Sequence, residues 1–225
     1  MIIATNTQEN KMLFKVICNI SDLLELPYTG WSKKTGLPSR IADGPAHLID
    51  LKIQARTTAA NSLREKYDLP EIDSIPDPID IERWSITNPS VVNKIADYLG
   101  FVKPSGRVQV LPPGAMVPFH LDNLGPGYLF NSEDTYQNND FTQEEYDKFA
   151  ADPACVQRVL IMLDDCKPGQ LMVFENDVCS GWKKGDVIHW SWQNTVHATI
   201  NAGCWSRPLL RVSGFATEKF FDLIK

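Results

Sequence analysis

A histidine and an aspartate stand one residue apart in the segment VPFHLDN, residues 117–123. His120 and Asp122 end an apolar run that is typical of a β-strand, and residues i and i+2 of a strand point to the same face. A carboxylate on a buried face is costly unless it is paired or coordinated. The spacing therefore allows two kinds of chemistry: a hydrogen-bonded His–Asp pair at the end of a strand, or one ion gripped by both side chains.

The sequence contains four histidines, so the choice of a third ligand is narrow. His47 precedes a charged, helix-like segment and is expected to be solvated. His189, in DVIHWSW, is flanked by large apolar residues and is expected in the core or at its rim. His197 lies on a β-like run 75 residues after Asp122. Two histidines and one carboxylate leave three positions of an octahedron open, which suits non-haem iron(II) better than zinc.

An arginine follows the third candidate ligand at a spacing of ten residues. Between His197 and Arg207 the chain can turn through NAG and return along the next strand. The Arg207 guanidinium could then reach the same cavity and hold the far end of a dicarboxylic acid through two parallel hydrogen bonds. Arg211 has the same strand parity and is the alternative. Either arginine could instead cap acidic residues at the rim of the sheet.

Three segments, PPGAMVPFHLD, GDVIHWSWQNTVHATINAG and SRPLLRVSG, resemble the iron(II)- and 2-oxoglutarate-dependent dioxygenases. The aspartyl/asparaginyl β-hydroxylase-like and prolyl hydroxylase-like branches are the most similar. The resemblance covers about residues 106–217 and implies that His120, Asp122 and His197 bind Fe(II), while Arg207 binds 2-oxoglutarate. The best-known β-hydroxylases have glycine in place of Asp122, and prolyl hydroxylases usually have lysine in place of Arg207, so the chain departs from both branches.

The same resemblance suggests further binding residues. Gln109 is a candidate for the co-substrate, and Arg158, Tyr128 and Trp190 are candidates for the substrate. For Tyr128 and Trp190 the alternative is plain packing, in a lid or in the core.

The activity implied by the resemblance is hydroxylation of an amino-acid side chain, with 2-oxoglutarate and O2 as co-substrates and succinate and CO2 as products. The substrate is either a peptide or protein, at Pro or Asp/Asn, or a free amino acid, and the sequence does not choose between them. A non-catalytic, cupin-like domain that binds a metal or a small molecule is the alternative. A complete ligand triad followed by Arg207 favours the enzyme.

Charge and cysteine content bound the partners and the compartment. The formal net charge of −6 and the pI of about 5.2 give no basic surface for nucleic acid. Together with the acidic residues between 133 and 152, they favour a neutral or basic substrate. Five scattered cysteines without a C-x-x-C pair are typical of a reducing compartment. With no signal pattern and no apolar run of membrane length, we expect a cytoplasmic protein with no membrane partner, in an oligomeric state that the sequence leaves open.

The first part of the chain is expected to be helical or mixed. Leu48, Leu51 and Leu63 have helical spacing, which predicts a helix over 47–67. Residues 68–84 contain three prolines and should form an extended connector. A second helix is expected over 88–100, with Asn88 as N-cap and Gly100 at its end. The earlier run KMLFKVICNI, residues 11–20, is rich in β-formers.

Six short β-rich segments separated by Gly, Pro, Asn and Asp follow Gly106, which predicts a mostly β (α+β) fold. We expect a double-stranded β-helix (jelly roll, cupin-like) core with N-terminal helices packed against it. The chain is expected to be one domain over 1–225, with a helical or mixed part over 1–105 and the β-helix core over 106–217. Within the core, 123–157 is expected to be an insertion that serves either as a functional flap or as a solvated acidic loop with a helical turn.

Overall fold

The computed structural model describes residues 13–24, 31–33, 65, 82–86, 90–122, 136–137, 142–175 and 177–225. The described helices are α1 (Ser21–Leu24), α3 (Ser90–Leu99), α5 (Gln143–Ala151) and α6 (Glu218–Ile224), with a 3-10 turn over Pro153–Cys155. The described strands are β1 (Phe14–Asn19), β2 (Trp31–Lys33), β3 (Glu82–Ile86), β4 (Phe101–Leu111), β5 (Met116–His120), β6 (Tyr136–Gln137), β7 (Val156–Met162), β8 (Gln170–Phe174), β9 (Asp177–Cys179), β10 (Asp186–Trp190), β11 (His197–Asn201) and β12 (Arg207–Ala216).

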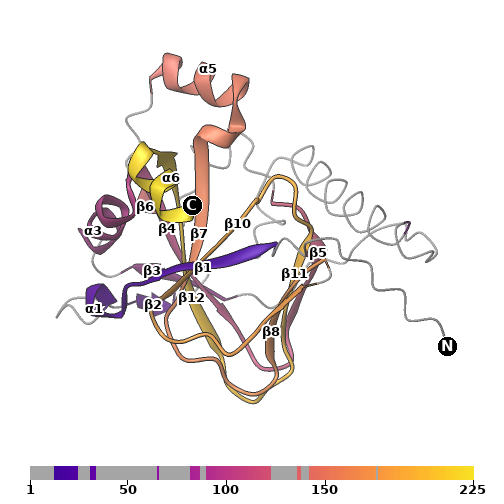
Figure 1. Cartoon of the computed structure of the whole chain (residues 1–225). Coiled ribbons are helices and arrows are strands. Elements are labelled where there is room, and N and C mark those ends of the chain that lie inside the picture. The colour runs from indigo at the N-terminus through magenta and orange to yellow at the C-terminus, as the bar shows by residue number, and fades with distance from the viewer. Residues whose placement is uncertain are drawn as a thin grey trace.

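The twelve described strands form two antiparallel sheets, and eight of them pair in a nested order. β4 pairs with β12, β5 with β11, β7 with β10, and β8 with β9, so the strands pair from the outside of the sequence inward. The larger sheet has the order β1-β10-β7-β12-β4-β3-β2, with β6 beside β4, and the smaller sheet has the order β5-β11-β8-β9. Figure 1 shows β5, β8 and β11 in one layer, apart from β4, β7 and β12. This is a double-stranded β-helix, and the predicted fold class is confirmed.

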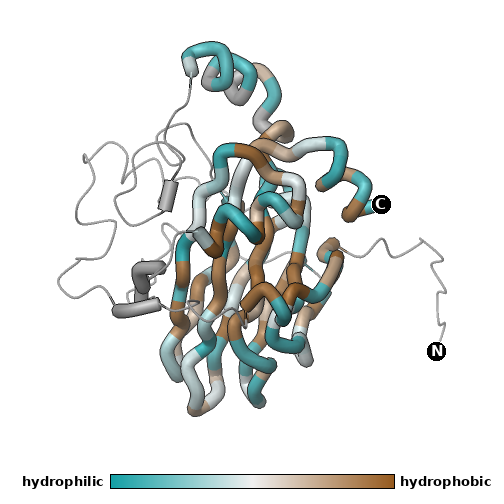
Figure 2. Tube along the Cα trace, turned by 90° about the vertical axis from the view of Figure 1, so that its left-hand side faces the viewer, coloured by the Kyte–Doolittle hydropathy of each residue, from teal (hydrophilic) through white to brown (hydrophobic). Residues whose placement is uncertain are grey.

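Alternation along the strands of the larger sheet divides the apolar residues into two cores. On β12, Leu210 and Val212 face outward to the helices, whereas Leu209 and Phe215 face inward to the smaller sheet. Brown, apolar stretches run along the strands in Figure 2, while teal marks the turns at the lower end and much of α5 at the top. The inner face of the larger sheet therefore lines the space between the two sheets.

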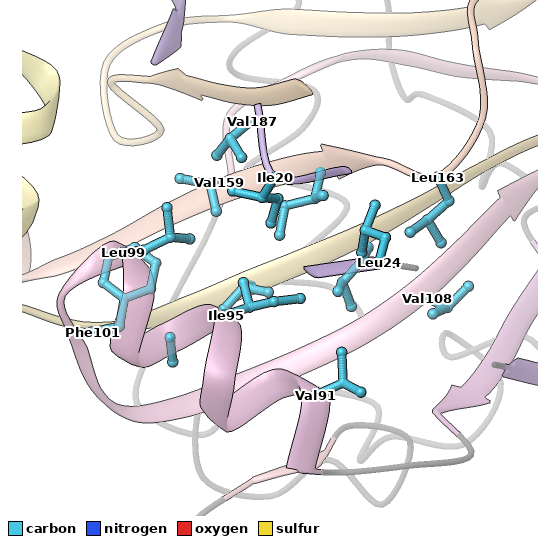
Figure 3. Packing of buried hydrophobic residues seen from close by; sticks show 14 of the residues in the cluster. Ile20, Leu24, Val91, Ile95, Leu99, Phe101, Val108, Val159, Leu163 and Val187 are labelled. Carbon is cyan, nitrogen blue, oxygen red and sulfur yellow. The ribbon is translucent and has the colours of Figure 1, made fainter. Parts of the chain in front are cut away.

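The outer core packs α1, α3 and α6 on the larger sheet. The spacing of Val91, Ile95 and Leu99 puts one apolar stripe of α3 toward the strands, and all three are buried. Figure 3 shows these side chains pointing to the same cluster as Ile20, which precedes α1, and Leu24, the last residue of α1. Each such fully buried aliphatic side chain contributes about 1.5–3 kcal/mol of transfer free energy. The prediction of an N-terminal helix packed against the β-core is met by α3, whereas α1 was not predicted.

Glycine ends α3 as the sequence predicts. Gly100 has φ +81°, and a Cβ there would lie 2.8 Å from the Phe220 backbone nitrogen, so only glycine fits without a shift. The predicted capping residues 88–89 and most of the predicted 47–67 helix lie outside the described residues; Glu65 alone of that segment is described, and it is helical. No helix in the described ranges has the length and apolar character needed to cross a bilayer.

Several predicted boundaries are wrong. The segment 107–122, read as one β-run, is split by a turn at Pro112–Gly114 into β4 and β5, which belong to different sheets. The strand β3 begins inside the predicted connector and ends just beyond it, and it pairs with β4 on one side and with β2 on the other. Neither β9 nor α6 is predicted, because three strand residues and a seven-residue helix are too short to give a clear periodicity.

The insertion is described from Thr142 onward, together with β6. Thr142 caps α5 in a capping box with Glu145, whose carboxylate also forms an ion pair with Lys103 of β4. Figure 1 shows α5 at the top of the molecule, beyond the N-terminal end of β7. The helical turn expected in this acidic segment is therefore a helix of nine residues, tied at its first turn to the larger sheet.

His189 lies on the outer face of β10 and belongs to the packing of α6. Its Nε2 is 2.9 Å from the Gln157 side-chain oxygen, and its ring stands edge-on to Phe220 at 5.4 Å between centroids. Burial, with a smaller effect of Lys15, lowers the pKa of His189 to about 4. The folded protein therefore holds this histidine neutral at a pH where an unfolded chain would protonate it.

This pKa predicts a loss of stability on acidification. The folded-state pKa of about 4 lies below the ordinary value of 6.5, so the unfolded state binds more protons between these values and stability falls as pH drops through that window. His189→Gln should remove up to about 3 kcal/mol of this pH dependence. Urea unfolding at pH 7 and pH 4 measures it. An equally steep loss in the variant would show that His189 does not carry the effect.

Candidate metal centre

Strand pairing brings the first and third candidate ligands together. His120, the last residue of β5, is the register partner of His197, the first residue of β11, and their ring centroids are 4.4 Å apart. Asp122 lies just past the end of β5. Its Oδ1 is 3.8 Å from His120 Nε2 and its Oδ2 is 4.0 Å from His197 Nε2. One ligand atom from each residue lies within 4.8 Å of the others, the one such group of three in the described ranges.

Backbone carbonyls fix the orientation of both imidazoles. Nδ1 of His120 is 2.8 Å from the Pro118 carbonyl oxygen, and Nδ1 of His197 is 3.2 Å from that of Thr195. A carbonyl oxygen only accepts hydrogen bonds, so each Nδ1 carries the proton and each Nε2 keeps its lone pair. Both lone pairs then belong to the nitrogens that face Asp122. The same arrangement orients histidine ligands in metalloproteins.

Arg158 controls the charge of the candidate carboxylate ligand. Its Nη1 donates to Asp122 Oδ2 at 2.8 Å, and its Nε donates to the Ser213 hydroxyl at 3.1 Å. Burial alone would raise the pKa of Asp122, but Arg158, followed by His197, His120 and Arg211, outweighs burial and holds this pKa far below its usual range. Asp122 is therefore a carboxylate at every physiological pH.

The charge state of His197 also suits metal binding. Burial lowers the pKa of His197, with Arg158 acting in the same direction, and these effects outweigh the opposing Asp122 carboxylate and the Thr195 hydrogen bond. A neutral imidazole is the form that binds a metal ion, so no proton has to be expelled first near neutral pH.

The donor set fits a divalent ion with open positions. The nearest distances from the Asp122 oxygens to the two Nε2 atoms, 3.8 and 4.0 Å, are too long for hydrogen bonds. Ligand atoms about 2.1 Å from one ion and at right angles lie about 3 Å apart, so small side-chain movements of about 1 Å or less would close the triad. Two nitrogens and one carboxylate oxygen on one side leave the opposite side for other ligands.

Arg207 lies deep between the sheets, 3 % exposed, at the start of β12. Its Nη1 donates to the Leu171 carbonyl at 3.2 Å, its Cζ lies 5.7 Å from the centre of the Trp182 ring, and its Nε has no hydrogen-bond partner. Burial lowers its pKa to about 10, opposed by the Cys166 and Cys179 thiols, so the group stays charged at neutral pH. Among the described residues no carboxylate forms an ion pair with it.

Two further buried polar atoms on the inner walls lack partners. They are Trp190 Nε1, on a ring 5.1 Å from that of His197, and Thr199 Oγ1, two residues after His197 on β11. Leaving a buried donor or hydroxyl unpaired costs about 1–3 kcal/mol. Groups of this kind indicate where a polar ligand would be received.

The remaining predicted residues are placed as follows. Gln109 is a half-buried residue of β4 opposite Leu209, on the inner-face parity of that strand. Arg158 contacts Asp122 directly, and Trp190 packs beside His197, whereas Tyr128 lies outside the described residues. Arg211 shares the inner-face parity of Arg207 and is close enough to Asp122 to lower its pKa.

Sequence reasoning missed Thr195, Thr199 and Ser213. None of them lies in a recognisable sequence motif. Strand alternation could have indicated two of them, because Thr199 is on the same strand face as His197, and Ser213 is on the same face as Arg207 and Arg211. The contact of the Thr195 carbonyl with His197 depends on the local backbone path and has no signature in residue types.

No protein-family model and no curated protein sequence matches the chain. Solved structures match at low identity. A Cupin 2 conserved barrel domain protein from Salinispora arenicola is 10 % identical, with 55 % of this chain and 71 % of that chain covered and a TM-score of 0.29. A predicted oxalate decarboxylase from Thermotoga maritima is 12 % identical (60 % and 80 % covered, TM-score 0.32). A nickel complex of the non-haem monooxygenase ThoJ is 16 % identical (57 % and 51 % covered, TM-score 0.34). No activity or ligand is transferred from these proteins to this chain.

The geometry predicts which histidine is required for metal binding. His197→Ala should weaken the binding of one Co(II) or Fe(II) per chain by at least about 100-fold, because loss of a ligand exceeds the cost of losing its supporting contacts. His189→Ala, the matched control, should bind the metal as the wild type does. Anaerobic titration monitored by calorimetry measures both affinities. A weaker affinity in His189→Ala than in His197→Ala would exclude a centre formed by His120, Asp122 and His197.

Proposed function

We propose that this protein is an Fe(II)- and 2-oxoglutarate-dependent oxygenase that hydroxylates an amino-acid side chain, of a peptide or of a free amino acid. The observation that carries the proposal is the combination of a His–Asp–His triad with Arg207, a buried guanidinium that has no carboxylate partner in the described part of the chain. A lone metal site would not require such a cation deep in the same interior. A dicarboxylic co-substrate would supply its missing partner.

The position of Arg207 supports its role over that of Arg211. At the end of β11 farthest from His197, Asn201 Nδ2 donates to the Leu111 carbonyl at 2.9 Å, and Leu111 is the register partner of Arg207. Asn201 lies four residue steps after His197 along β11, a distance of about 13 Å. The long arginine side chain and a short extended diacid can together span this distance. Arg211 lies back at the level of the triad, too near the metal to hold the far end of such a molecule.

Each residue of the proposed site would have a distinct role. His120, Asp122 and His197 would hold iron(II), which when bound supplies the activation of dioxygen. Arg207 would fix the distal carboxylate of 2-oxoglutarate, and Arg158 would keep Asp122 ionised and oriented. Buried side chains of the inner core would exclude water from the region between the triad and Arg207; they include Met172, Phe174, Trp190 and Leu209.

The proposal predicts consumption of 2-oxoglutarate. Purified protein supplied with Fe(II), 2-oxoglutarate and air should release succinate above a metal-free control, and a substrate should increase the rate. Succinate measured by mass spectrometry tests this. If iron and 2-oxoglutarate bind but no succinate forms with any amino-acid or peptide pool, the protein is a binding domain instead.

A matched pair of arginine variants tests the co-substrate site. Arg207→Gln should raise the 2-oxoglutarate concentration needed for half-maximal succinate release by about 10- to 100-fold, since charge-assisted hydrogen bonds contribute about 1.5–3 kcal/mol. Arg211→Gln should raise it far less. Equal effects, or a larger effect of Arg211→Gln, would contradict the assignment of Arg207.

A further inference from the structure

One cross-strand row of the smaller sheet carries both candidate histidine ligands and ends at Asp177. Phe174 is the register partner of His197 on one side and of Asp177 on the other. His197 is in turn the register partner of His120. Register partners on antiparallel strands point to the same face, and Phe174 belongs to the core between the sheets, so the whole row faces inward. The position of His197 therefore depends on its neighbours in this row.

The N-terminal strand β1 contacts this row at two points. Leu13, which precedes β1, donates its backbone N–H to Asp177 Oδ2 at 2.9 Å. The Phe14 ring stacks on the Phe174 ring, with 4.9 Å between the centroids and 24° between the planes. β1 is the edge strand of the larger sheet, and β9, which begins at Asp177, is the edge strand of the smaller sheet. The two contacts therefore join the edges of the two sheets on one side of the candidate centre.

Aromatic packing continues from Phe14 to the candidate ligand itself. Phe174 stacks on His197, with 25° between the planes and 5.9 Å between the centroids. Trp190, the register partner of Phe14, stands edge-on to His197 at 5.1 Å. Phe174 and Trp190 are buried, whereas Phe14 is half-buried. Two aromatic rings thus limit the tilt of the imidazole, and Phe14 supports them from the edge of the larger sheet.

We propose that Phe14 and Asp177 are positioning residues of the metal centre, which hold the start of β1 against the smaller sheet and thereby set the orientation of His197. The inference rests on the metal centre of the proposed function. It gives a role at the site to the first described strand, which lies outside the segment that carries the family resemblance.

The orientation of His197 needs more than its own hydrogen bond. The Thr195 carbonyl holds one ring atom, Nδ1, and leaves the ring free to swing about that contact. The planes of the neighbouring rings restrict this second rotation, which decides where the Nε2 lone pair points. Groups that orient a histidine ligand typically change metal affinity by about 10- to 100-fold when they are removed.

A purely structural role of the same contacts has a different consequence. A residue that only stabilises the fold lowers the melting temperature and leaves the metal affinity of the folded protein unchanged. A positioning residue changes the affinity, and the geometry of the bound ion, while the protein remains folded. Co(II) reports both quantities, because its visible absorption bands depend on the arrangement of its ligands.

Anaerobic Co(II) titration of full-length variants tests the proposal, at a temperature where circular dichroism shows each variant to be folded. Phe14→Ala and Asp177→Ala should each weaken Co(II) binding by about 10-fold and change the visible bands of the Co(II)-saturated protein. Asp177→Asn should bind as the wild type does, because a carboxamide oxygen can still accept the Leu13 N–H. Val16→Ala of β1 and Val178→Ala of β9, which shorten exposed side chains, are the matched controls and should also bind normally.

The outcomes separate this inference from the proposed function. Wild-type affinity and bands in both Phe14→Ala and Asp177→Ala would overturn the inference and leave the metal centre standing. Equal weakening in Asp177→Asn and Asp177→Ala would overturn the role of the Leu13 hydrogen bond. A wild type that binds no Co(II) would refute the centre and this inference together. A wild type that binds Co(II) and shows the expected variant effects, but forms no succinate with Fe(II), would refute the oxygenase alone.

Discussion

The ion pair between Arg158 and Asp122 is the constraint on which the candidate centre depends. A buried carboxylate without a cation would be protonated or would drive the chain to rearrange, and removing one partner of a buried pair costs about 3–5 kcal/mol. Because Arg158 is fixed in turn by Ser213, the carboxylate is held both ionised and oriented. Beside it stand two imidazoles whose Nε2 lone pairs are directed by backbone carbonyls. The site is thus preorganised by groups that are not themselves metal ligands.

Nested strand pairing explains how residues so distant in sequence form one site. The β5–β11 pair lies inside the β4–β12 pair in the sequence, and the β7–β10 and β8–β9 pairs lie within it. This closes the chain around a common interior, with His120 opposite His197. It also sends Arg207 to the other end of that interior, since β12 starts where β11 finishes. The separation of the candidate ligand triad from Arg207 is therefore a consequence of topology, and a ligand that bridged them would have to be elongated.

The sequence was sufficient for the fold class, the triad and the deep arginine because each leaves a local signal: period-two apolar runs, an H-x-D spacing at a strand end, and a return strand opening with arginine. The sequence did not predict the ion pair between Arg158 and Asp122, since Arg158 was expected to bind the substrate. That contact arises from β7 lying beside β12, a long-range pairing that no local pattern reports. The division of residues 107–122 between two sheets was also not predicted. There a Pro–Pro–Gly turn interrupts one apolar run, and the chain passes from the larger sheet to the smaller one.

The contrast between surface and interior charge bears on substrate choice. A net charge of −6 and an acidic segment around α5 favoured a neutral or basic ligand, but net charge is dominated by solvated side chains, which salt screens. Between the sheets the described charged side chains include four arginines and one aspartate: Arg107, Arg158, Arg207, Arg211 and Asp122. Charges in a low-dielectric interior interact far more strongly than those in water, so these few groups outweigh the many on the surface in selecting what enters.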